Sequence, residues 1–211
     1  IGYYNNSSVM CFFSQQSKSA VELEYRFKAN FPSKASYEPG FYNAFQYPKT
    51  PIISNKYPQE IQLFQWGLIP FWAADDSIKK YTLNARMETI HQKPAFRQAV
   101  NNRCLILADA FFEWQWLDDK GKQKQKYALT LPGNSLFAFA GLWSEWTDKQ
   151  TGEVIKSYTI LTTQANELMS LIHNSKKRMP VILSPDNELD WLNGQSPTMQ
   201  NDALIANAIS S

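Results

Sequence analysis

Cysteine and histidine are scarce in this chain of 211 residues, which has two cysteines, Cys11 and Cys104, and two histidines. Two cysteines provide no disulfide framework, although one bridge between them stays open at this point. No spacing typical of metal ligands is present. We therefore expect a cytoplasmic protein that needs no metal and no cofactor.

Strong charge and long apolar runs are also missing. The formal net charge of +2 is too small to indicate a nucleic-acid partner, so that interpretation depends on local patches. No run approaches the roughly 18 apolar residues of a membrane span, and Ile1–Val9 is too polar for a signal peptide. We interpret residues 1–9 as a leader or an expression remnant, and residues 10–211 as a single domain.

Aromatic residues, in contrast, are abundant, and many lie in short alternating segments that end at turn residues. Phe111–Leu117 turns at Asp118–Lys122 into Lys126–Leu131, and Leu136–Trp146 is followed by Ile155–Thr162. Such pairs are typical of antiparallel hairpins. We predict an α+β fold in which a mainly antiparallel sheet curls into a barrel-like core with surrounding helices.

Apolar spacing and proline positions predict four helices. The last of them has Pro185 at its first position and Ser184 as its N-cap, and the third brings His173 to its end. The predicted helices span Ser17–Phe31, Pro94–Val100, Ala165–Ile172 and a segment that ends at Leu192.

Cys11 has two interpretations. After Met10 it is either a small buried hydrophobic residue at the start of a strand or, once the preceding residues are removed, the amino terminus. An amino-terminal cysteine carries an amine of pKa near 7.7–8.0 beside a nucleophilic thiol. This pair can capture an aldehyde, because the amine forms an imine and the sulfur then closes a thiazolidine ring.

Other polar residues stand in contexts that could support chemistry. Glu113, in an aromatic run, either faces solvent or occupies an apolar pocket that would raise its pKa for acid–base work. His173 is either a helix cap or part of a phosphate site with the basic residues that follow it. Asn84 and Arg86 would point the same way on an extended segment, and the turn after Pro70 would expose aromatic side chains.

Taken together, these segments resemble the SOS response-associated peptidase (SRAP) family. The resemblance runs in order from residue 10 to about residue 191. It rests on Met10-Cys11, Trp66–Trp72, Asn84–Thr89, Arg103–Asp109, Phe111–Trp114, Ile172-His173 and Arg178–Leu183.

The resemblance implies an abasic-site sensor that acts in DNA repair on single-stranded DNA and traps the opened sugar as a thiazolidine crosslink. It also implies self-removal of the residues before the cysteine, together with peptidase and lyase activity. The implied catalytic residues are Cys11, Asn84, Glu113 and His173, and the implied DNA-binding residues are Trp72, Arg86 and Arg178. From the basic cluster after His173 we add Lys177 as a DNA-binding residue. We expect a monomer that associates with the nucleoid when it is bound to DNA and makes no membrane contact.

This chain departs from the family pattern at three places. Phe12-Phe13 stands where the family has Gly-Arg, so a phosphate-binding arginine is missing. The loop Asn43–Gln46 lacks the usual proline, and Asn174–Lys177 lengthens the spacing between the histidine and the arginine.

Two other functions stay open from the sequence. Cys11, His173 and Glu113 could form a cysteine peptidase, which would have to work with the Cys11 amine blocked in a peptide bond. Trp72 and the basic cluster could instead make a non-enzymatic module that binds single-stranded DNA.

The aminothiol chemistry leads to a prediction about residues 1–10. While Met10 is attached, the nitrogen of Cys11 is an amide and forms no imine, so the full chain should not crosslink abasic DNA. A chain whose translation starts at Met10, with the methionine then removed, should crosslink. Intact mass and crosslink yield of the two forms measure this. Equal yields from an unprocessed long form would contradict the mechanism.

Overall fold

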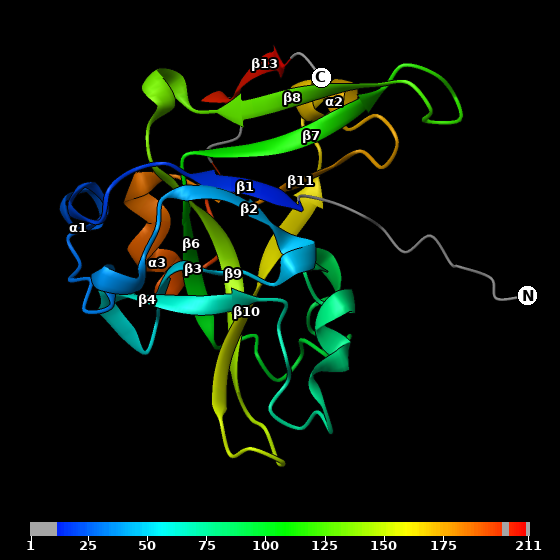
Figure 1. The fold of residues 1–211 in the computed structure, drawn as a ribbon. Coiled ribbons are helices and arrows are strands. Elements are labelled where there is room, and N and C mark those ends of the chain that lie inside the picture. Colours follow the sequence, from blue (N-terminus) through cyan, green and yellow to red (C-terminus); the bar gives the residue numbers. More distant parts are fainter. Residues whose placement is uncertain (1–11, 200–202, 210–211) are drawn as a thin grey trace, which may run out of the picture.

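The computed structural model describes residues 12–199 and 203–209, and a closed ring of five strands forms its centre (Figure 1). In ring order these strands are β10 (Val154–Gln164), β4 (Tyr57–Trp66), β3 (Lys49–Ser54), β6 (Arg103–Ala108) and β9 (Phe137–Thr147). All neighbours are antiparallel except β10 and β4.

Pairing of β9 on both of its edges closes the barrel. Gly141 lies opposite Cys104 of β6 and also opposite Ile160 of β10. Short strands extend the ring: β5 (Asn84–Arg86) and β11 (Arg178–Pro180) pair with β10, and β12 (Ile182–Leu183) pairs with β9.

A second sheet of five strands lies beside the barrel (Figure 1). Its order is β13 (Ile205–Ile209), β8 (Lys124–Thr130), β7 (Ala110–Trp116), β1 (Phe13–Gln16) and β2 (Gly40–Asn43). The predicted α+β class with a mainly antiparallel, barrel-like core is therefore confirmed.

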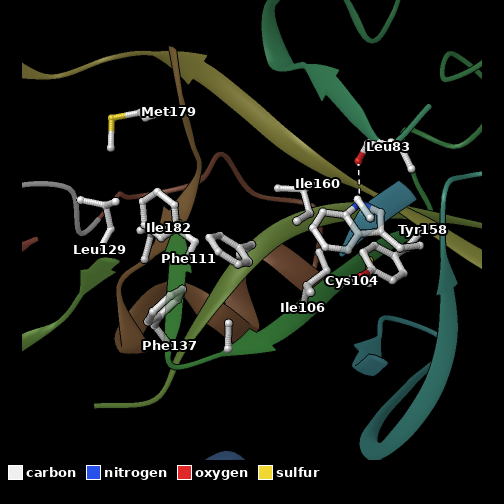
Figure 2. Packing of buried hydrophobic residues seen from close by; sticks show 14 of the residues in the cluster. Leu83, Cys104, Ile106, Phe111, Leu129, Phe137, Tyr158, Ile160, Met179 and Ile182 are labelled. Carbon is white, nitrogen blue, oxygen red and sulfur yellow. Dashed lines mark hydrogen bonds between the residues drawn. The ribbon is translucent and has the colours of Figure 1, made fainter. Parts of the chain in front are cut away.

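Strands β3 and β6 and the middle parts of β9 and β10 are buried on both faces. Ile52 belongs to one core cluster and its neighbour Ile53 to another, as alternation along a strand requires. The first cluster joins the barrel to the second sheet through Phe111 and Leu129 (Figure 2). The second cluster is shared with Leu23 of helix α1 (Ala20–Phe27) and with helix α3 (Glu188–Leu192).

Helix α1 is shorter than the predicted span Ser17–Phe31. It begins after Ser19, which forms a capping box with Glu22, and it ends at Lys28 in the left-handed conformation. Ser17 is held outside the helix because its backbone N–H and hydroxyl bind the Asp109 carboxylate.

Two other helix predictions needed correction. Residues 94–100 form successive turns, with only one i→i+4 hydrogen bond there, from Arg97 N–H to the Lys93 carbonyl. At the C-terminal helix, Pro185 begins a 3-10 turn, the α-helix starts only at Glu188, and the Ser184 side chain makes no cap hydrogen bond. Helix α2 (Glu167–Ile172), with His173 at its C-cap, agrees with prediction.

Gly141→Ala should destabilise the barrel. A Cβ at Gly141 would lie 2.7 Å from the Thr159 carbonyl oxygen and would also meet the Ile106 side chain. Because a paired backbone carbonyl cannot move aside, we expect a loss of about 3 kcal/mol, the upper part of the overpacking range. Urea unfolding measures the change.

Gly40→Ala is the matched control, because a Cβ there meets nothing within 4 Å. Its free energy of unfolding should stay within about 1 kcal/mol of the wild type. If both variants lost the same free energy of unfolding, the strands would not be packed too closely at Gly141 to accept a Cβ.

Candidate active site

The chain enters β1 at Phe12. The Phe12 carbonyl accepts a hydrogen bond from Ala44 N–H at 2.8 Å, and its ring centroid lies 4.4 Å from that of Phe45. The 3-10 turn Ala44–Gln46 thus holds the residue that follows Cys11, although it lacks the proline typical of the family. Cys11, the predicted nucleophile, lies outside the described residues.

Glu113 is buried and not turned toward solvent. It lies two residues after Phe111 on β7, so the two side chains share the face that points toward the core. Only 7% of Glu113 is exposed. Of the two interpretations of the sequence, the structure supports the buried one.

His173 is also buried and has a defined orientation. Its Nδ1 lies 3.1 Å from the Arg178 carbonyl oxygen. A carbonyl oxygen only accepts hydrogen bonds, so Nδ1 carries the proton. In the neutral ring, Nε2 is then the nitrogen that can accept a proton.

Asn174 ties the end of α2 to strand β7. Its side-chain oxygen accepts from Trp116 N–H at 3.1 Å, and its side-chain nitrogen donates to the Trp116 carbonyl at 2.8 Å. Gln115 Nε2 adds a bond to the Leu171 carbonyl at 3.1 Å. β1 pairs with β7 only as far as Phe112, so Asn174 occupies the edge of β7 beyond that point.

Asn84 begins β5 and is half-buried, opposite Ile160 of β10. The preceding residue, Leu83, is fixed because its carbonyl accepts from Trp66 Nε1 at 2.8 Å (Figure 2). Leu83, Phe111 and Ile172 belong to one core cluster, against which Phe12 packs. A residue within two positions of each predicted catalytic residue therefore contacts this cluster.

The two predicted DNA-binding arginines differ in their surroundings. Arg178 donates to both oxygens of Glu88, at 2.7 and 2.9 Å, and to the Thr162 carbonyl at 2.8 Å. Arg86 is exposed on β5 opposite Thr162, and no hydrogen bond joins its guanidinium to any residue that the structure describes. Arg86 is thus the more available cation.

Trp72 and Lys177 lie at the surface. Trp72 is 45% exposed in the turn after Pro70, as the sequence predicts. Lys177 is exposed and adopts the left-handed conformation at the end of the 174–177 segment.

Sequence reasoning missed two residues that shape this region. The sequence predicts for Asn174 only a longer spacing between His173 and Arg178, whereas its side chain joins α2 to β7. Glu88 had no predicted role, although it lies two residues from Arg86 and binds Arg178. No local sequence pattern indicates either contact, because the partners are 58 and 90 residues apart in the chain.

Residues 12–199 and 203–209 contain no group of three histidine, cysteine, aspartate or glutamate side chains that could hold a metal ion. Every helix in this part of the chain is too short or too polar to cross a bilayer.

Comparison with known proteins identifies the class. The family of SOS response associated peptidases (SRAP) matches residues 10–210. The chain belongs to this family.

Curated relatives carry a more specific name. The abasic site processing protein YoaM of Bacillus subtilis is 44% identical over 164 residues, which cover 77% of this chain and 69% of the relative. The abasic site processing protein HMCES of Gallus gallus is 30% identical over 202 residues and is covered over 58% of its length, against 80% of this chain.

Solved structures share the fold. A protein from Bacteroides thetaiotaomicron has a TM-score of 0.86 at 33% identity, with 95% of this chain and 92% of that chain covered. One from Bordetella bronchiseptica has a TM-score of 0.79 at 28% identity, with 95% and 100% covered.

The Arg178–Glu88 pair predicts a shifted titration. Hydrogen bonds from Arg178 lower the pKa of the Glu88 carboxyl, against a smaller effect of burial. A lowered carboxyl pKa stabilises the fold above the unfolded pKa, and this contribution is lost as the pH falls through the folded pKa. In Arg178→Gln the Glu88 pKa should rise, and acidification should cost the variant less stability than it costs the wild type.

Carboxyl NMR titration of Glu88 measures the pKa. Arg86→Gln is the control, because Arg86 is the weakest of the causes that lower this pKa. If the Glu88 pKa rose equally in the two variants, the bidentate contact with Arg178 would not be the main cause of the lowered pKa.

Proposed function

We propose that the protein is an abasic-site sensor on single-stranded DNA that forms a thiazolidine crosslink through Cys11. Membership of the SRAP family and relatives named abasic site processing proteins support this proposal. The observation that carries it is the burial of two groups suited to proton transfer, one on β7 and one on the segment tied to β7. Glu113 lies on the strand that pairs with β1, and His173 is tied to that strand through Asn174.

The proposed reaction joins an amine, a thiol and an aldehyde. The free amine of Cys11 attacks C1′ of the ring-opened sugar and gives a carbinolamine. The carbinolamine loses one water to form an imine. The Cys11 thiolate then adds to the imine carbon, the nitrogen takes up a proton, and a five-membered ring closes.

Each buried polar residue has a proposed role in this sequence. His173, whose Nε2 can accept a proton, exchanges one with the sugar ring oxygen and favours the open aldehyde. Glu113 carries protons to and from the carbinolamine as water leaves. Asn84 orients the sugar or the cysteine backbone.

The proposed DNA contacts lie on the surface. Trp72 stacks on a base beside the lesion, which contributes about 1–3 kcal/mol. Arg86 and Lys177 are exposed and bind phosphates. Arg178 is already paired with Glu88, so it contributes to DNA binding only if a phosphate competes with that carboxylate or adds to the pair.

The same residues support a second activity. The family is named for a peptidase, and Cys11 could attack the carbonyl of Met10 with Glu113 or His173 as proton carrier. That attack would transfer the Met10 acyl group from the Cys11 nitrogen to its sulfur. Water would then hydrolyse the thioester, which frees both the amine and the thiol that the crosslink needs. We also include lyase activity in the proposal, together with action as a monomer.

A heat-stable adduct tests the proposal. A chain that begins with free Cys11 should form one with an abasic single-stranded oligonucleotide and none with the intact oligonucleotide. Cys11→Ala should lose the adduct but keep reversible DNA binding. Denaturing electrophoresis measures the yield.

Cys104→Ala is the matched control. Cys104 is fully buried, and burial raises the pKa of its thiol well above the usual value, so it is a poor nucleophile. This variant should keep the adduct. Loss of the adduct in Cys104→Ala but not in Cys11→Ala would show that Cys104 is the reacting cysteine and would contradict the proposal.

A further inference from the structure

The outward face of the second sheet carries aromatic rings and lysines. Side chains alternate along β7, so Phe112, Trp114 and Trp116 point away from the core, opposite to Phe111 and Glu113. Register places Trp114 opposite Lys126 and Trp116 opposite Lys124. We call Phe13, Phe41, Trp114, Trp116, Lys124 and Lys126 the aromatic–lysine face.

Ring contacts make this face continuous across the three strands β2, β1 and β7. The ring of Phe13 lies 5.5 Å from that of Phe41 and 5.0 Å from that of Trp114. Phe41 is 48% exposed, and Trp114 is half-buried. Trp116 has Gly121 packed against it, where an added Cβ would lie 2.6 Å from the indole.

The lysine amines lie over these rings. Lys126 Nζ is 5.2 Å from the centroid of Phe41 and 5.5 Å from that of Trp114, and Lys124 Nζ is 5.4 Å from that of Trp116. Such contacts contribute only about 0.5–1 kcal/mol at exposed sites, so a stronger anion can draw the amines away.

No carboxylate lies among the outward residues of these five strands. From the register, these residues are Phe13, Gln15, Phe41, Asn43, Ala110, Phe112, Trp114, Trp116, Lys124, Lys126, Ala128, Thr130, Ile205, Asn207 and Ile209. At the nearby hairpin tip, Asp118 accepts hydrogen bonds from the backbone N–H groups of Lys120, Lys122 and Gln123. The face therefore carries positive charge without compensation on its own strands.

We propose that the aromatic–lysine face is a second contact surface for single-stranded DNA. Bases would stack on the exposed parts of Trp114, Trp116 and Phe41, and phosphates would bind Lys124 and Lys126. A nucleotide supplies the aromatic partner and the negative charge together. A purely apolar partner would leave the lysines unpaired.

Position sets the length of DNA that this occupant requires. Trp114 directly follows Glu113 on β7, but the two side chains lie on opposite faces of the sheet. A strand held at the candidate site would have to pass around the edge of the sheet to reach the aromatic–lysine face. The choice of DNA as the occupant rests on the proposed function.

Noncovalent binding of undamaged oligonucleotides tests the surface without the crosslink. The wild type should bind an oligonucleotide of about 15 nucleotides at least tenfold more tightly than one of about 5, because only the longer one reaches both surfaces. Trp116→Ala and the double variant Lys124→Gln/Lys126→Gln should lose most of this advantage. Fluorescence anisotropy measures both affinities.

Salt dependence gives a second readout. For single strands each phosphate contact contributes about 0.7 to the slope of log affinity against log salt, so the double lysine variant should lose about 1.4. Lys56→Gln/Lys149→Gln removes the same charge from exposed turns of the barrel sheet and should leave the slope unchanged. Thermal melting checks that Trp116→Ala keeps its fold. If Trp116→Ala does not fold, the double lysine variant alone tests the surface.

The outcomes separate the two proposals. If the wild type shows no length dependence, or if the face and control variants lose the same affinity, the aromatic–lysine face is not a DNA surface. If the length advantage depends on the face but no abasic adduct forms, the surface stands and the crosslinking proposal fails. On a short abasic oligonucleotide, the face variants should crosslink at the wild-type yield.

Discussion

Alternation of side chains along β7 is the constraint on which the rest of the structure depends. One face of this strand contributes Phe111 to the shared core and buries Glu113, whereas the other carries the rings of Phe112, Trp114 and Trp116. A shift of one residue in its pairing with β8 would exchange the two faces. It would bring the carboxylate to solvent and drive three aromatic rings into a core already filled by other side chains.

Backbone hydrogen bonds along both edges of β7 hold this register. β8 pairs with its whole length, and β1 pairs with its first part. Asn174 then binds Trp116 where β1 is absent, so a side-chain amide replaces a strand. The first residue of the segment 174–177 is therefore hydrogen-bonded to the sheet, and its last two residues are exposed lysines.

Local patterns predicted much of the fold. Alternation predicted the hairpins, and the spacing of Leu168, Met169 and Ile172 predicted α2. The predicted helix boundaries were wrong where contacts with residues far away in the sequence outweigh the local helix pattern. Asp109 holds Ser17 outside α1 from 92 residues away, and the segment 94–100 packs Phe96 and Ala99 into the core through turns. Likewise, the sequence marks Arg178 as a cation but carries no sign that Glu88 already binds it.

The barrel can close only late in synthesis, after most of the chain has been made. Contacts that define the candidate site join β1 to β7 and β7 to the end of α2, and β10 completes the ring only once residue 164 exists. At about 5–20 residues per second, a ribosome needs on the order of ten seconds to pass from β1 to α2. Until β7 has been made, β1 has only its neighbour β2 to pair with. Enzymes that trim a nascent amino terminus therefore meet the chain before β1, β7 and α2 have come together.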